Sequence, residues 1–158
     1  MNDKFILDAI RAKYPGTAIV PEISIDDPYW HDWARGRERL YQNTGMKPYR
    51  RIDALMFKSF ERTAIEIKTS KADFNNDTLE KRRPWQRVVH RFIYAVPYDL
   101  NVVAPHGCGL WKVHPDGKIT IGKKAIVRKH PEQLPQDVIQ RLAYRAATSA
   151  STVDTLPA

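Results

Sequence analysis

The chain has 158 residues, with 26 Lys and Arg against 18 Asp and Glu, a formal net charge of +8 and one cysteine. This length suits a single domain, and one cysteine excludes both an intramolecular disulfide and a metal site built on thiolates. No apolar stretch approaches the about 20 residues of a membrane span, and the first residues do not resemble a secretory signal, so we expect a cytoplasmic protein without membrane contact.

The basic residues are concentrated in the middle of the chain. Residues 47–91 carry twelve Lys and Arg against six Asp and Glu. A basic surface favours nucleic acid as a partner, because Lys and Arg release counterions from the phosphate backbone. The alternative interpretation is a solvated basic face that promotes solubility.

The chain opens with a predicted helix and a predicted edge strand. Asn2 or Asp3 can cap a helix that ends at Tyr14-Pro15-Gly16. Residues 18–25 are rich in β-branched side chains and form the first predicted strand, in which Pro21 favours an edge position or a bulge.

The remaining pattern predicts five strands and two helices, within one domain that covers residues 1–147. They are a hairpin of strands 51–58 and 62–68, a helix that starts at Pro84 and continues to 91, a buried strand 92–96, a second hairpin of strands 109–113 and 118–121, and a helix over 135–147. We expect an irregular insertion over 26–47, a polar loop up to Asp77, and a disordered tail over 148–158.

The first predicted hairpin carries the most informative motif, RRIDALMF followed by AIEIKTSKADFNND. Because side chains alternate between the faces of a strand, Glu66 and Lys68 share one face while Ile65 and Ile67 point to the other. If the preceding strand pairs alongside with Asp53 on the first face, two carboxylates and one lysine meet at the rim of the sheet. Such a site suits a hard divalent cation, because Mg²⁺ takes oxygen ligands from one or two carboxylates and keeps several waters.

Asp53 followed by the Glu66-Ile67-Lys68 triplet resembles the core of the PD-(D/E)XK nuclease superfamily. Over residues 48–122 the ordered blocks RRIDAL, IEIKTSKADFNND, HRFIYAVP, a proline-containing loop and GLWKVHPDGKI are similar to those of the MmcB-like DNA repair nucleases and related phage proteins. The resemblance implies an α/β fold with a restriction-endonuclease-like core. This core is a central mixed β-sheet in the order α-β-β-β-α-β, flanked by helices, to which the present chain adds a β-hairpin and a C-terminal helix.

The resemblance also implies an activity, namely metal-dependent hydrolysis of phosphodiester bonds in DNA during repair, recombination or phage DNA processing. Asp53 and Glu66 would hold Mg²⁺ or Mn²⁺ with the backbone carbonyl of Ile67 as a third ligand. Lys68 would position the attacking water or offset charge in the transition state. The structural alternative is a surface ion pair between Lys68 and a carboxylate, which would contribute little stability.

Further acidic residues are assigned accessory roles. Asp73 and Asp77 match the family block and either form a second carboxylate shell or anchor the loop. Members of the family often place an acidic residue on the first helix near the metal. Here Asp3 and Asp8 lie on that helix, and Glu22 on the following strand is the substitute that we assign to the metal.

The residues expected to contact DNA come from the basic middle of the chain. Gln86 and His90 are spaced i, i+4 and are expected on one face of the second helix, near the substrate, although His90 is as well explained as a helix-surface residue. The predicted nucleic-acid-binding side chains are Arg50, Arg51, Lys71, Lys81, Arg82, Arg83 and Gln86.

Two alternatives to a nuclease stay open. A module with this fold could bind nucleic acid without cleaving it, although the retention of Asp53, Glu66 and Lys68 argues against a dead enzyme. The chain could also act as an accessory subunit of a DNA repair complex, because it is small and has no separate specificity domain. A homodimer and a repair-complex partner are both compatible with the sequence.

Overall fold

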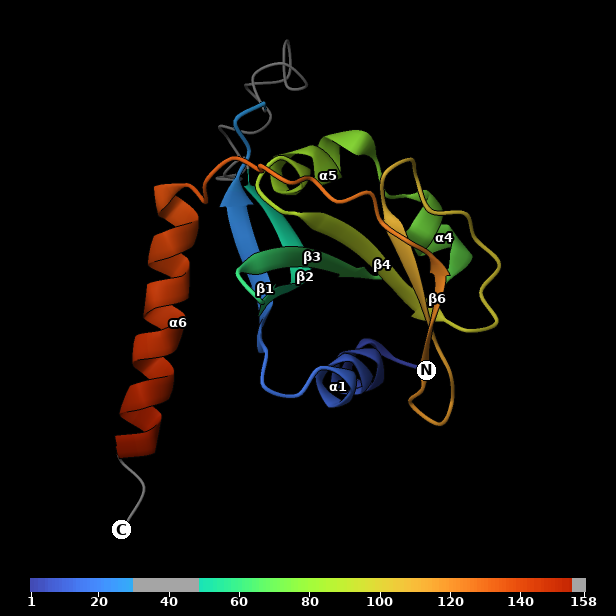
Figure 1. Ribbon diagram of the computed structural model, residues 1–158, viewed down its shortest axis with the longest axis horizontal. Coiled ribbons are helices and arrows are strands. Elements are labelled where there is room, and N and C mark those ends of the chain that lie inside the picture. The colour runs from blue at the N-terminus through green and yellow to red at the C-terminus, as the bar shows by residue number, and fades with distance from the viewer. Residues whose placement is uncertain (30–48, 155–158) are drawn as a thin grey trace, which may run out of the picture.

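The computed structural model describes residues 1–29 and 49–154, and most of the expected insertion over 26–47 lies outside the described residues. The fold is α/β, with a six-stranded mixed sheet flanked by helices (Figure 1). Among the described residues, no helix is long and apolar enough to cross a membrane.

The strands lie in the sheet in the same order as in the chain. They are β1 (Ala18–Asp26), β2 (Tyr49–Lys58), β3 (Glu61–Ile67), β4 (Arg91–Pro97), β5 (Gly109–Val113) and β6 (Ile119–Lys123). The first three strands form an antiparallel meander, β3, β4 and β5 run parallel, and β6 returns antiparallel to β5. Parallel pairing of β3 with β4 requires a crossover, and two short helices provide it.

Helices cover both faces of the sheet (Figure 1). Helix α1 (Asp3–Lys13) lies on one face, and the crossover helices α4 (Lys71–Asn75) and α5 (Leu79–Gln86) lie on the other. Helix α6 (Gln136–Asp154) runs beside the edge strand β1, where Arg141 and Arg145 donate hydrogen bonds to the β1 carbonyls of Ser24, Pro21 and Glu22. This helix therefore covers the polar edge that β1 would otherwise expose.

The sheet separates two hydrophobic cores. Ile6 and Ile10 of α1 are fully buried in one core, and Trp85 of α5 is fully buried in the other. The Trp85 indole also donates a hydrogen bond of 2.9 Å to the carbonyl oxygen of Arg50 on β2. Strand β4 is buried along nearly its whole length, which explains its continuous apolar sequence.

Several predicted elements are confirmed. Asn2 caps α1 by accepting a hydrogen bond from the backbone N–H of Phe5. Strand β1 lies at the edge of the sheet, as Pro21 favours. Gly117 takes the positive φ of 83° that the turn between β5 and β6 requires.

Three predictions about helices are wrong. The crossover helix starts at Leu79, after its cap Thr78, and contains Pro84 inside it, whereas we expected a start at Pro84. The expected polar loop contains α4, which Ser70 caps. The capping side chains of Ser70 and Thr78 start these helices, and a proline in an eight-residue helix removes few internal hydrogen bonds. Helix α6 continues to Asp154, so the first part of the expected disordered tail is helical.

Candidate functional site

The two carboxylates of the motif lie opposite each other on neighbouring strands. The ladder between β2 and β3 ends at the pair Ala54 and Ile65, and Asp53 and Glu66 are the next residues on the two strands. One oxygen of the Asp53 carboxylate accepts a hydrogen bond of 2.7 Å from the backbone N–H of Ile67. The predicted proximity of Asp53 to the Glu66-Ile67-Lys68 triplet is therefore present in the fold.

A local irregularity helps to place Asp53. Ile52 and Leu55 belong to the same core although three positions separate them, so the alternation of side chains is interrupted at Asp53. Across the ladder, Glu22 lies at the matching position of β1 and has a φ of 48°. Both strands thus depart from regular geometry at the same level of the sheet, beside the candidate site.

Lys68 completes the cluster from the end of β3. Its Nζ lies 2.9 Å from Oε1 of Glu66 and 3.6 Å from Oδ1 of Asp73 on α4. The side chains of Lys68 and Glu66 are only 12% and 15% exposed. This ion pair is therefore shielded from water, unlike the exposed surface pair considered as the alternative.

The carboxylates of this cluster hold their protons more tightly than free ones. Burial raises the pKa of Glu66 to about 7, and the neighbouring Asp53 carboxylate adds to this effect. Burial also raises the pKa of Asp53, although the Ile67 N–H partly opposes it. Burial alone would lower the pKa of Lys68, but the carboxylates of Glu66, Asp73 and Asp77 raise it overall. The cluster thus concentrates negative charge that its one lysine does not fully offset.

A cavity of about 210 Å³ opens beside the cluster, and its rim is basic. Its lining residues are Tyr49, Arg50, Arg51, Ile52, Glu66, Lys68, Asp77, Lys81, Arg82 and Phe92. Four of these residues are the predicted nucleic-acid-binding side chains Arg50, Arg51, Lys81 and Arg82. Acidic and cationic side chains thus line the same cavity, which suits a phosphate ester together with a metal ion.

The basic residues at and near this rim differ in whether other side chains already bind them. Arg50 lies 3.2 Å from an oxygen of the buried Asp27, and Arg82 lies 3.6 Å from Asp77. The guanidinium of Arg83 stacks 3.7 Å over the ring of Tyr29. Arg51 and Lys71 are exposed and occur in no ion pair within the described part of the chain. The exposed pair is therefore better placed to bind phosphates than Arg82 and Arg83 are.

Asp77 is an anchor as well as a lining residue. The hydroxyl of Tyr94 on β4 donates a hydrogen bond to its carboxylate, and burial together with this bond raises the pKa of Tyr94. Tyr94 is fully buried and lies opposite Glu66 in the ladder. Sequence analysis missed Tyr94, yet a tyrosine inside the apolar strand FIYAV indicates that its hydroxyl needs a buried partner.

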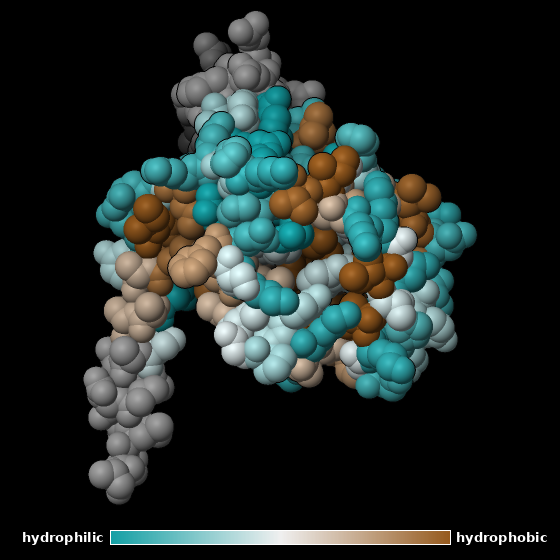
Figure 2. Space-filling model, in the orientation of Figure 1, coloured by the Kyte–Doolittle hydropathy of each residue, from teal (hydrophilic) through white to brown (hydrophobic). Residues whose placement is uncertain are grey.

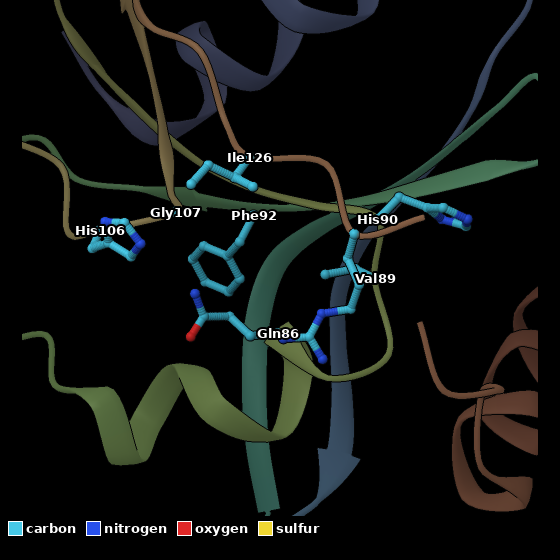
Figure 3. A pocket seen from close by; sticks show the side chains of 8 residues that line it. Gln86, Val89, His90, Phe92, His106, Gly107 and Ile126 are labelled. Atoms are coloured by element: carbon cyan, nitrogen blue, oxygen red, sulfur yellow. The ribbon is translucent and has the colours of Figure 1, made fainter. Parts of the chain in front are cut away.

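Gln86 and His90 do not share a helix face, because α5 ends at Gln86. His90 lies in the connection to β4, where its Nδ1 accepts a hydrogen bond from the backbone N–H of Arg62. Both residues nevertheless line one cavity of about 350 Å³ (Figure 3). Figure 3 shows the ring of His90 directed away from Phe92 and Gln86. This cavity is separate from the one that contains Glu66 and Lys68, although Phe92 lines both.

The outer acidic residue near the cluster is Asp3 of α1. The negative charge of Asp3 contributes to the raised pKa of Asp53, after the effect of burial. Glu22, the substitute assigned from the sequence, lines a different cavity between β1 and α6 together with Arg141 and Arg145. The structure therefore favours the helix position over Glu22, which lines the cavity beside α6 instead.

The residues of the cluster fit a divalent cation of the Mg²⁺ class. Asp53 and Glu66 supply hard oxygen atoms. Both are buried carboxylates with raised pKa values, and a bound cation would reduce the electrostatic repulsion between them. Within residues 1–29 and 49–154 there is no group of three or more His, Cys, Asp and Glu side chains that could hold a metal. A metal here would therefore depend on these two carboxylates, with a backbone carbonyl and water as further ligands.

Comparisons with known proteins inform the fold alone. No family model matches the chain, and no curated protein matches it. A solved protein of unknown function from Silicibacter pomeroyi is similar, with a TM-score of 0.56 and 22% sequence identity. The alignment covers 92% of this chain and 84% of that protein. This similarity extends over nearly the whole chain and supports the α/β architecture described above.

Proposed function

We propose that this protein is a metal-dependent nuclease of the PD-(D/E)XK type that hydrolyses phosphodiester bonds in DNA. The observation that carries the proposal is the cluster of Asp53, Glu66 and Lys68, in which two carboxylates face each other across β2 and β3 and Nζ of Lys68 lies 2.9 Å from Glu66. The site opens to a cavity with a basic rim. DNA repair, recombination or phage DNA processing is the biological context that we propose.

The arrangement of the sheet supports the same proposal. An antiparallel meander of three strands, a helical crossover and a parallel fourth strand follow α1 in the order α-β-β-β-α-β, as expected for a restriction-endonuclease-like core. The cluster lies on β2 and at the end of β3. The strands β5 and β6 and helix α6 then correspond to the hairpin and helix that this chain adds.

Each residue of the cluster would have a distinct task. When bound, a divalent cation would neutralise charge on the phosphate and lower the pKa of a water. Asp53 and Glu66 would hold it, and the hydrogen bond from Ile67 fixes the orientation of Asp53. Lys68 would orient the water or offset charge that develops on the phosphate oxygens. The basic rim would keep the DNA backbone against the cavity.

The test is cleavage of labelled single-stranded, branched and duplex DNA, and of RNA, with Mg²⁺, Mn²⁺ or EDTA. Wild-type protein should cut with the metals and be inactive in EDTA. Asp53→Asn and Glu66→Gln keep the size of the side chain but remove its charge, so each should abolish cleavage and weaken Mn²⁺ binding in calorimetry. Glu22→Gln is the matched control and should cut like the wild type. Undiminished cleavage by both site variants would eliminate the proposed site.

One observation favours a non-cleaving nucleic-acid-binding module as the second candidate. The Lys68 ammonium already occupies an oxygen of Glu66 that a metal ligand would use. In such a module, or in an accessory subunit of a repair complex, the cluster would be a buried ion pair that stabilises the basic surface. DNA binding without cleavage under every metal condition would select this alternative.

A further inference from the structure

The tip of the β2–β3 hairpin carries an aromatic side chain in an unfavourable position. Ser59 and Phe60 form the turn with φ angles of 49° and 62°, where Asn and Gly are the preferred residues. The side chain of Phe60 is 105% exposed, so it has no packing partner that would offset this strain. Backbone strain that no packing offsets occurs most often at functional sites and ligand contacts.

A cavity of about 460 Å³ adjoins the tip, and both neighbours of Phe60, Ser59 and Glu61, line it. Met56, Ile93 and Trp111 contribute to its apolar part. Trp111 stacks on Tyr14 with 5.4 Å between the ring centroids. The volume lies in the range of about 300–1,000 Å³ that is typical of ligand sites, and the walls suit a flat apolar group.

The same cavity has a cationic rim. Its charged lining residues are Lys58, Arg91 and Lys124 against the single carboxylate of Glu61, which pairs with Arg91. Lys58 is exposed and its Nζ lies 4.8 Å from the centroid of the Tyr14 ring. Lys124 is also exposed. Two lysines therefore remain to attract an anion beside the aromatic groups.

We infer that the hairpin tip and this cavity form a second contact for a single nucleic-acid strand. An unpaired base stacks on the ring of Phe60, and phosphates of the strand lie against Lys58 and Lys124, because a nucleotide combines a flat apolar base with an anion. Lysines with exposed aromatic groups also bind anionic lipid, and the experiment below therefore includes lipid vesicles. For the identity of its ligand, this inference rests on the proposed function.

The tip and the catalytic cluster lie at opposite ends of β3. Glu66 lies six positions after Phe60, which corresponds to about 20 Å along an extended strand. The cavity lies on the α1 side of the sheet, with Met56 and Trp111, whereas the cluster lies on the α5 side, beside Tyr94. A strand held at both places would therefore have to span at least this distance and pass around an edge of the sheet, whereas a dinucleotide would reach only one of them. The second contact therefore makes the protein prefer longer unpaired strands over short ones.

The experiment measures binding of fluorescent single-stranded DNA in EDTA by anisotropy, together with thermal unfolding. Phe60→Gly should raise the melting temperature, because glycine tolerates a positive φ, and should weaken binding by about 5- to 150-fold, the loss expected for one stacked base. Phe60→Tyr keeps the ring and should bind like the wild type. Tyr144→Ala, which removes an aromatic side chain that is 75% exposed on α6, is the matched control and should bind normally.

Unchanged affinity of Phe60→Gly for single-stranded DNA would overturn the inference. A loss of binding only to vesicles of anionic lipid would overturn it as well. Failure of the proposed nuclease function would give a different experimental result. If the wild type binds the strand through Phe60 but never cuts it with Mg²⁺ or Mn²⁺, the second contact stands and the nuclease proposal fails.

Discussion

At the scale of single residues, Glu66 is the group whose charge state matters most. Burial and the neighbouring Asp53 raise its pKa from 4.5 to about 7 in the folded protein. The folded state therefore binds more protons than the unfolded state between these two values. It follows that the stability contributed by Glu66 is fully present below pH 4.5 and is lost as the pH rises through about 7.

We expect metal-free protein to lose about 3 kcal/mol of unfolding free energy over this pH range because of Glu66. Glu66→Gln has no charge to bury and should not show this loss. The measurement is urea unfolding in EDTA across the range, with Mn²⁺ added to a parallel series. Saturating Mn²⁺ should reverse the trend in the wild type, since the cation favours the ionised carboxylate. Identical pH profiles for the wild type and Glu66→Gln in EDTA would contradict the assignment.

Lys68 lies in the same cluster but should affect a different step. It has no oxygen with which to coordinate a metal, and its ammonium repels a cation near Glu66. Lys68→Ala should therefore bind Mn²⁺ at least as tightly as the wild type above pH 7 and bind DNA in Ca²⁺, yet cut at least about 100-fold more slowly. Calorimetry, anisotropy and cleavage on this one variant separate the steps. Loss of Mn²⁺ binding by a folded Lys68→Ala would instead mean that the lysine organises the carboxylates.

At the scale of elements, the connection between α4 and α5 is fastened to the sheet by one buried hydrogen bond. Tyr94 on β4 donates to Asp77, whose side chain is 7% exposed. Asp77 also lies 3.6 Å from Arg82 of α5. The bond therefore links the crossover helices to the strand beside Glu66 and keeps the basic rim over the cavity.

Tyr94→Phe removes the donor and leaves a buried carboxylate with one fewer partner. We expect a loss of about 1–3 kcal/mol in unfolding free energy, measured by urea denaturation. Tyr98→Phe removes a hydroxyl from a residue that is 45% exposed and should change stability by less than about 0.5 kcal/mol. Equal stability of the two variants would show that the Tyr94 hydroxyl makes no important bond.

The crossover also shows where local sequence signals compete. Thr78 caps α5 through a hydrogen bond to the backbone N–H of Lys81, and Ser70 caps α4. Pro84 suggested a later helix start because proline is favoured in a first turn. The buried Trp85, which bonds to Arg50 of β2, holds the last turn of α5 on the sheet despite the proline. Tertiary packing of Trp85 therefore outweighed the preference of proline for the first turn of a helix.

At the scale of the whole molecule, the net charge of +8 should govern binding to DNA. The logarithm of the binding constant should fall linearly with the logarithm of the salt concentration, with a slope of about −0.7 to −0.9 for each neutralised phosphate. Replacing the exposed Arg51 and Lys71 with Ala should flatten this slope by about 1–2 units. Lys118→Ala, on the hairpin between β5 and β6, is the control. A slope near zero for the wild type would mean that the charge serves only as a solvated face.

The hydrophilic character of the outer surface agrees with DNA binding that is governed by charge. On the face that Figure 2 shows, hydrophilic side chains predominate and hydrophobic ones occur in small groups. Charge therefore governs the long-range attraction of a polyanion, whereas an exposed aromatic side chain of the described residues, such as Phe60, can provide a specific contact.

The sequence by itself determined the α/β class, the edge position of β1, both hairpins and the candidate cluster. Strand alternation and turn residues are local signals, and a motif of Asp53, Glu66 and Lys68 needs only the pairing of two adjacent strands to come together. Long-range contacts are required for the rest. Tertiary structure alone decided that Asp3 lies near Asp53, whereas Glu22 lines the cavity beside α6. It also decided that the Tyr94 hydroxyl bonds to Asp77. His90 lies outside the helix that ends at Gln86 and accepts a hydrogen bond from Arg62. These outcomes depend on which distant elements pack together, and no spacing within a single segment encodes that choice.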